Sequence, residues 1–192
     1  MVVMIAVRPG QIIFLNGTTS AGKTSIGEQL QLMLEKPYFH LSVDRISGMR
    51  AELRTSQLSP NELDAVLART RAGFHRVVAG MAQAGNDVIV DHVLSEPWRL
   101  RDCLTVLAGY DVIFVGVHCS LPELERREHV RGTRPIGLAA SQFAAVHSHG
   151  VYDIECHTEV FTPRECALQV TEYLMNPAQP SAFHRLRVIM GS

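Results

Sequence analysis

Short apolar runs bounded by turn residues alternate along this chain with segments whose apolar residues recur at helical spacing. The strand candidates are residues 11–16, 38–43, 87–91, 111–118 and about 152–158. Continuous apolar runs are typical of strands buried on both faces, and their alternation with helical segments indicates βαβ units. The pattern predicts an α/β domain in which helices cover both faces of a five-stranded parallel sheet, a three-layer αβα arrangement.

Three helix starts are marked by a hydroxyl residue placed three positions before a glutamate. These pairs are Ser59 with Glu62, Ser120 with Glu123, and Thr162 with Glu165. Each pair predicts a capping box, which satisfies the free N–H groups at a helix start. We therefore expect helices from about 60 (running to about 84), 121 and 163. Residues 177–192 show no convincing period, so we expect one domain over 1–176 and leave this tail without a fold prediction.

Residues 17–24 spell the phosphate-binding pattern G-x-x-x-x-G-K-[ST]. They follow the strand candidate 11–16 and precede a helical stretch from Ser25 to Leu34, which is the context such a loop needs. In this reading Lys23 reaches the β- and γ-phosphates of ATP and the Thr24 hydroxyl ligates Mg²⁺. A glycine-rich turn without a ligand is the alternative. The predicted nucleotide-binding residues here are Gly17, Thr18, Thr19, Ser20, Ala21, Gly22, Lys23, Thr24 and Ser25.

Two aspartates end predicted strands at the edge where open α/β sheets bind ligands. Asp44 follows the strand 38–43 and suits a base that takes the proton of an acceptor hydroxyl. Its alternative role is to cap a helix that starts at Arg45. Asp91 closes the run Val88 to Val90 and suits a second Mg²⁺ ligand. A structural turn aspartate is the alternative there.

A basic cluster lies between residues 126 and 137. Arg127, Arg131 and Arg134 are spaced by four and three residues, so they share one face if the segment is helical. Nearby glycines loosen the chain, and we expect a lid near 126–137 that brings guanidinium groups to the transferring phosphate. Arg127 is assigned to nucleotide binding, whereas Arg131 and Arg134 are assigned to catalysis together with Asp44 and Lys23. The alternative is a solvated helix face with arginines paired to glutamates.

Composition narrows the class of partner. The 192 residues carry a formal net charge of −1, so there is no global basic field to attract a nucleic acid. The longest apolar run is well short of the ~20 residues needed to cross a bilayer. Met1 to Val7 is read as a leading segment of the fold, and four scattered cysteines suit packing in a reducing compartment. We expect a cytoplasmic protein without membrane partners; the sequence does not indicate an oligomeric state.

These motifs together resemble the chloramphenicol phosphotransferase-like kinases, which use ATP to phosphorylate a hydroxyl of the antibiotic. The likeness runs from Ile12 to about Val170. It is carried by Leu15 to Gly17, Ser20 to Lys23, Val43-Asp44, Met81 to Gly85 with Ile89 to Asp91, Val115 to Cys119, Arg127-Glu128, Arg131-Gly132, Arg134, Val146-His147 and Gly150 to Asp153. The resemblance implies a P-loop kinase with strand order 2-3-1-4-5, Asp44 as catalytic base, and lid arginines at 131 and 134.

The chain also departs from that family pattern. His92 stands where a second acid is expected, and Cys156 to Thr158 replaces a more acidic strand end. The expected function is transfer of the γ-phosphate of ATP to a hydroxyl of chloramphenicol or a related small molecule. Absence of the guanine-selecting N-K-x-D pattern favours ATP. A metabolite kinase of the shikimate, gluconate or adenylylsulfate kinase type and a nucleotide-dependent regulatory switch remain alternatives, and a resistance or a metabolic role would use the same residues.

Overall fold

A computed structural model describes residues 8–132 and 136–191. Within them, one parallel sheet has the strand order β2-β3-β1-β4-β5. Each strand overlaps its predicted range, and the predicted order is confirmed; the segment Met1 to Val7 lies outside the described residues. The strands are β1 Ile12–Asn16, β2 Phe39–Ser42, β3 Val88–His92, β4 Val112–His118 and β5 Ile154–His157.

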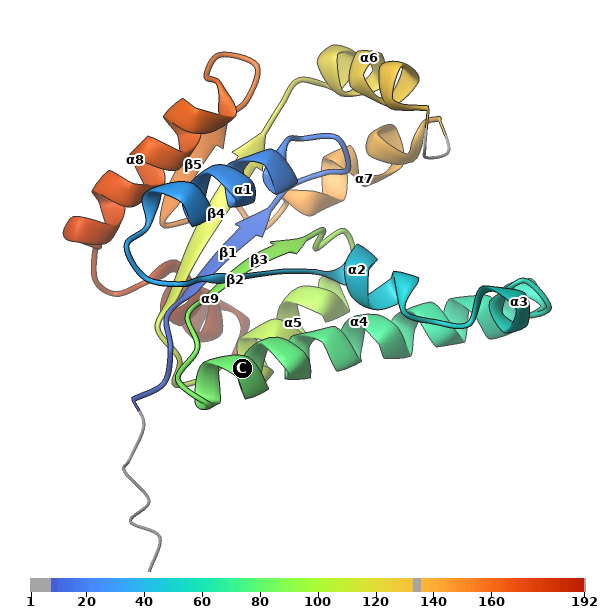
Figure 1. Cartoon of the computed structure of the whole chain (residues 1–192), viewed down its shortest axis with the longest axis horizontal. Helices are drawn as coiled ribbons and strands as arrows, with labels where there is room; N and C mark the ends of the chain where they lie inside the picture. Colours follow the sequence, from blue (N-terminus) through green and yellow to red (C-terminus); the bar gives the residue numbers. More distant parts are fainter. Residues whose placement is uncertain (1–7, 133–135, 192) are drawn as a thin grey trace, which may run out of the picture.

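Helices cover both faces of this sheet, as predicted (Figure 1). The helices α4, α5 and α9 pack on one face, whereas α1 and α8 pack on the other. Helices α6 and α7 lie beyond the carboxyl ends of the strands (Figure 1). The bounds are α1 Lys23–Met33, α2 Val43–Gly48, α3 Glu52–Thr55, α4 Pro60–Gln83, α5 Pro97–Val106, α6 Leu121–Arg131, α7 Leu138–Val146, α8 Pro163–Met175 and α9 Ala182–Met190. No helix in the described ranges combines the length and apolarity that crossing a membrane requires.

The two cores follow from side-chain alternation along the central strands. Phe14 and Val90 belong to the core beneath α4, α5 and α9, whereas Leu15 and Ile89 belong to the core beneath α1 and α8. Successive residues of a strand point to opposite faces, so every central strand contributes to both cores. The same alternation decides which helix each polar residue at a strand end will face.

Two of the three predicted capping boxes are present. Glu62 accepts a hydrogen bond from the Ser59 N–H (2.9 Å), and Glu165 accepts one from the Thr162 N–H (2.8 Å). The box predicted at Ser120 is wrong, although the helix does begin at Leu121. Charge-assisted bonds to two arginines hold the Glu123 carboxylate, and the Ser120 N–H donates to Glu159 Oε2 instead (3.0 Å).

The C-terminal tail, which has no fold prediction from the sequence, forms helix α9 and packs into the core. Phe183 is 1% exposed, and its ring lies 5.8 Å from that of Phe14 and 5.0 Å from that of Phe114. Asp153 fixes the start of this helix by accepting a hydrogen bond from the Ala182 N–H (2.6 Å). The tail therefore stabilises the central strands that carry the site.

Phe183→Ala is expected to lower the free energy of unfolding by about 3–5 kcal/mol, because it removes a buried ring and leaves a cavity. Ile189→Ala is the matched control on the same helix, since Ile189 is 68% exposed and should change stability little. Urea unfolding followed by circular dichroism measures both. Equal effects of the two substitutions would contradict the packing described for α9.

Candidate active site

The phosphate-binding loop connects β1 to α1, as the sequence predicted. A Cβ atom on Gly17 would lie 2.4 Å from the Val117 carbonyl oxygen, so only glycine fits that approach. Gly22 has a φ of 95° and Ser20 a φ of 60°, both in the left-handed region that glycine adopts most easily. Helix α1 then begins at Lys23, two residues before the predicted start, which places the free N–H groups of its first turn at the loop.

A cavity of about 540 Å³ opens over this loop. Thr19, Ser20 and Gly22 line it together with Lys23, Thr24 and Ser25. The other predicted loop residues, Gly17, Thr18 and Ala21, are buried. The Thr19 N–H donates to Gln142 Oε1 on α7 (2.9 Å).

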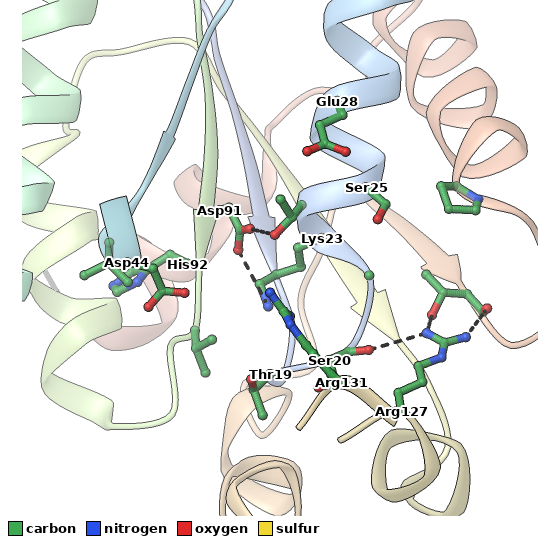
Figure 2. Close-up of a pocket in the computed structure, with 16 residues that line it drawn as sticks. Thr19, Ser20, Lys23, Ser25, Glu28, Asp44, Asp91, His92, Arg127 and Arg131 are labelled. Carbon is green, nitrogen blue, oxygen red and sulfur yellow. Dashed lines mark hydrogen bonds and ion pairs between the residues drawn. The ribbon is translucent and has the colours of Figure 1, made fainter. Parts of the chain in front are cut away.

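Lys23, Thr24 and Asp91 meet at one side of the cavity. The Thr24 hydroxyl donates to Asp91 Oδ2 (2.6 Å), and Lys23 Nζ lies 3.7 Å from Asp91 Oδ1. Lys23 also donates to the Thr18 carbonyl oxygen (2.7 Å). Figure 2 shows Asp91 joined to both α1 side chains by dashed lines. An ammonium, a hydroxyl and a carboxylate are thus brought together by two separate motifs of the sequence.

These residues fit a nucleoside triphosphate and a magnesium ion. Ser20 Oγ is buried in the loop and has no hydrogen-bond partner among the described residues, which is a position a phosphate oxygen would satisfy. The Thr24 hydroxyl and the Asp91 carboxylate are hard oxygen ligands of the kind that Mg²⁺ prefers. Since Mg²⁺ usually keeps several waters and phosphate oxygens, two protein ligands are enough.

Arg127 supports the phosphate-binding loop through hydrogen bonds and does not simply project into solvent. Its guanidinium donates to the Thr158 carbonyl oxygen (2.8 Å) and to Thr158 Oγ1 (3.0 Å), which in turn donates to the Ala21 carbonyl oxygen (2.8 Å). Ion pairs of the kind expected for a solvated helix face, the alternative to a lid, are also present, because Glu123 pairs with both Arg126 and Arg127. Hydrogen bonds from those two arginines lower the pKa of Glu123 to about 2. Arg127 therefore links α6 to the loop and to the β5–α8 connection.

The segment proposed as a lid starts in α6, which ends at Arg131 and is followed by Gly132 at a φ of 61°. Arg131 lines the cavity and points into it in Figure 2. The carboxylate of Glu128, 2% exposed, accepts hydrogen bonds from the N–H groups of Gly137 (3.1 Å) and Ala139 (2.7 Å), which joins α6 to α7. Arg134 lies outside the described residues, so its place on a shared helical face and the lid itself stay predictions.

Asp44 lies in the first turn of α2 and lines the same cavity. The alternative that Asp44 caps this helix is wrong, because Ser42 is the capping residue and its Oγ accepts a hydrogen bond from the Arg45 N–H (3.2 Å). Figure 2 shows Asp44 and His92 on the side of the cavity opposite Arg127. The carboxylate thus faces the phosphate-binding residues across the cavity.

Sequence reasoning did not assign several residues that line the cavity. Glu28 follows Thr24 by one helical turn on α1, a spacing that could have signalled a shared face. From the sequence, His92 fits either a substrate contact or a packed or solvated structural histidine; in the structure it is 1% exposed and lines the cavity. Burial lowers the pKa of His92 well below its ordinary value, with further contributions from His75, Arg99, Lys23 and Arg71.

The strand order, the glycine-rich loop after β1 and the helices on both faces define a P-loop kinase fold. Solved structures share it: an APS kinase of Mycobacterium tuberculosis in complex with AMPPNP and APS matches with a TM-score of 0.63 at 18% identity, covering 88% of this chain and 99% of that one. The shikimate kinase of Aquifex aeolicus matches with a TM-score of 0.61 at 14% identity, covering 86% and 96%. At these identities the likeness shows the fold alone.

The family follows from sequence. A family model described as chloramphenicol phosphotransferase-like protein matches residues 10–175. A Mycobacterium tuberculosis protein that carries the name Putative O-phosphotransferase is 30% identical over 214 residues, which cover 96% of this chain and 91% of that protein. The chain belongs to the chloramphenicol phosphotransferase-like family, and it is an enzyme of the kinase type.

Lys23→Ala is expected to abolish productive use of ATP, because it removes the ammonium that faces the loop and leaves the Asp91 carboxylate buried without that charge. Lys36→Ala is the control: Lys36 is exposed and pairs with Asp87 away from the cavity. Calorimetric titration with ATP analogues and turnover assays measure both variants. Wild-type turnover in Lys23→Ala would exclude the assigned role.

Proposed function

We propose that this protein transfers the γ-phosphate of ATP, with Mg²⁺, to a hydroxyl group of chloramphenicol or a related small molecule. The observation that carries this proposal is the shared cavity: Asp44 lies across it from the cluster of Lys23, Thr24 and Asp91. Phosphoryl transfer needs a phosphate cradle, charge neutralisation and a group that accepts the proton of the attacking hydroxyl. Each of these requirements has a residue at this cavity.

The roles follow from the chemistry of each group. The loop N–H groups and Lys23 hold the phosphates, and Thr24 with Asp91 would hold Mg²⁺, which supplies charge neutralisation when bound. Asp44 accepts the proton of the acceptor hydroxyl as that oxygen attacks. Arg131 and Arg134 stabilise the charge that develops on the transferring group. Arg127 holds the phosphate-binding loop and the β5–α8 connection at Thr158 together, beneath the nucleotide.

A metabolite kinase is the second candidate, because both APS kinase and shikimate kinase share the fold. The regulatory switch is less favoured, because a switch phosphorylates no acceptor molecule. It would therefore have no use for Asp44 as a base facing the phosphate site. Coupled ADP release separates the three, measured with Mg-ATP alone and with chloramphenicol, shikimate, gluconate or adenylylsulfate. Acceptor-dependent release with one added phosphoryl group by mass spectrometry supports a kinase and names its acceptor. Hydrolysis that no acceptor changes would contradict the proposal.

Asp44→Asn is expected to lower kcat about 10²- to 10⁴-fold, since the amide cannot accept the hydroxyl proton. Affinity for ATP should stay nearly unchanged, because Asp44 lies on the side of the cavity opposite Arg127 (Figure 2). The control Asp64→Asn changes an exposed carboxylate on α4. Steady-state kinetics with the acceptor from the panel measure both. Wild-type turnover in Asp44→Asn would remove the base assignment.

Arg131→Ala and Arg134→Ala are expected to lower kcat more than they raise KM for ATP, because guanidinium groups that act on the transferring phosphate matter most in the transition state. Arg126→Ala serves as control, since Arg126 is exposed and pairs with Glu123. Parallel measurements of kcat and KM decide the outcome. A rise in KM for ATP with unchanged kcat would mean that these arginines bind substrate uniformly.

A further inference from the structure

His92 is a buried group at the cavity to which the proposed mechanism gives no task. It follows Asp91 in β3, so strand alternation turns it to the opposite face of the sheet, toward α4. Its ring packs 5.4 Å from Phe74 and 6.2 Å from Phe14. His92 Nδ1 is buried and has no hydrogen-bond partner among the described residues. A polar atom in that position normally has a partner, and the cavity that His92 lines can bring one.

The other ring nitrogen of His92 belongs to a chain of hydrogen bonds that reaches α5. His92 Nε2 lies 3.0 Å from His75 Nε2 on α4, and His75 Nδ1 lies 2.6 Å from Asp102 Oδ2. The Arg76 guanidinium also donates to both oxygens of Asp102, at 2.8 and 3.0 Å. Burial acts to raise the pKa of Asp102, but hydrogen bonds from Arg76 and His75 outweigh it and lower that pKa. Asp102 is therefore a carboxylate, which can only accept hydrogen bonds.

This series of hydrogen bonds fixes the tautomer of both histidine rings. Because Asp102 only accepts, His75 carries its proton on Nδ1. Burial lowers the pKa of His75 despite that carboxylate, so the ring is neutral at pH 7 and its Nε2 is an acceptor. The proton between the two rings must then sit on His92 Nε2. With its proton on Nε2, the His92 ring has a lone pair on Nδ1.

Arg99 of α5 fixes the connection that follows β3. Its guanidinium donates to the Val93 carbonyl oxygen and to Ser95 Oγ (both 3.0 Å). The backbone directly after His92 is therefore held in place by α5.

We propose that His92 Nδ1 accepts a hydrogen bond from a second donor group of the acceptor molecule, and that His75 and Asp102 are positioning residues that hold His92 in the required tautomer. This inference rests on the proposed function, because Asp44 takes the hydroxyl that is phosphorylated. It narrows the acceptor to a molecule with two hydroxyl groups, or with one hydroxyl and one N–H, that can face Asp44 and His92 together.

The first test reads the tautomer in the free wild-type protein, with no acceptor needed. In protein labelled with ¹⁵N-histidine, two-bond ring correlations at pH 7 should show His92 protonated at Nε2 and His75 protonated at Nδ1, assigned by loss of signals in His92→Asn and His75→Gln. Asp102→Ala should release this state, whereas the control Arg76→Lys keeps the His75 to Asp102 bond and should preserve it. A His92 protonated at Nδ1 overturns the inference.

The second test measures recognition with chloramphenicol, which offers two hydroxyls and an amide N–H. His92→Leu should raise KM for chloramphenicol about tenfold through loss of one hydrogen bond and leave KM for ATP unchanged. His92→Asn keeps an acceptor oxygen near the Nδ1 position and should restore most of the affinity. A chloramphenicol analogue that keeps the phosphorylated hydroxyl but lacks both the second hydroxyl and the amide N–H should be insensitive to His92→Leu. An equal rise in KM for ATP, or no effect of Leu in a folded variant, contradicts the assignment.

The two tests separate this inference from the proposed function. If neither chloramphenicol nor the panel is phosphorylated while His92 shows the expected tautomer, the proposed kinase reaction fails and so does the acceptor contact built on it. If phosphorylation is robust but His92 is protonated at Nδ1, the kinase stands and the hydrogen-bond role of His92 is removed. Kinase activity together with the expected tautomer and the KM pattern supports both.

Discussion

Consecutive side chains of a β-strand point to opposite faces of the sheet, and the site depends on this constraint at the end of β3. Asp91 turns toward α1, where it meets Thr24 and Lys23, and His92 turns toward α4, where it meets His75. One strand end therefore supplies the phosphate side of the cavity with a carboxylate and the opposite side with an imidazole. A shift of β3 by one residue would exchange these positions and destroy both arrangements.

The buried cluster on the α1 side is costly unless its charges are balanced. Lys23 is 5% exposed and Asp91 is 9% exposed, so each would lose much of its hydration without a partner. The 3.7 Å separation of Lys23 Nζ and Asp91 Oδ1, the hydrogen bond from Thr24 and the Thr18 carbonyl oxygen together provide that balance. The same groups are complementary to a phosphate and a cation, because a phosphate can engage the ammonium while the carboxylate engages the cation.

Features encoded by neighbouring residues could be predicted from the sequence, and features assembled from distant ones could not. The loop at 17–24, the strand order and the helix starts all rest on short motifs or on a resemblance carried by them. The box at Ser120 failed because Glu123 prefers Arg126 and Arg127, two charged partners on its own helix. Helix α9 was missed because it is only nine residues long, and its buried residues Ala182, Phe183 and Leu186 span little more than one turn. The series of hydrogen bonds from His92 through His75 to Asp102 joins three elements, and no spacing of residues along the sequence predicts it.

This difference explains why the phosphate chemistry is easier to infer than the acceptor. The phosphate side is built largely from one continuous segment with Asp91 added, so a motif of eight residues specifies most of it. The proposed acceptor side draws Asp44 from α2, His92 from β3, and support from α4 and α5, so its shape depends on how separate elements pack. A buried hydrogen-bond acceptor without a partner discriminates strongly between molecules that can and cannot donate to it. In the role proposed for His92, the orientation of its imidazole ring would therefore separate substrates that the phosphate site treats alike.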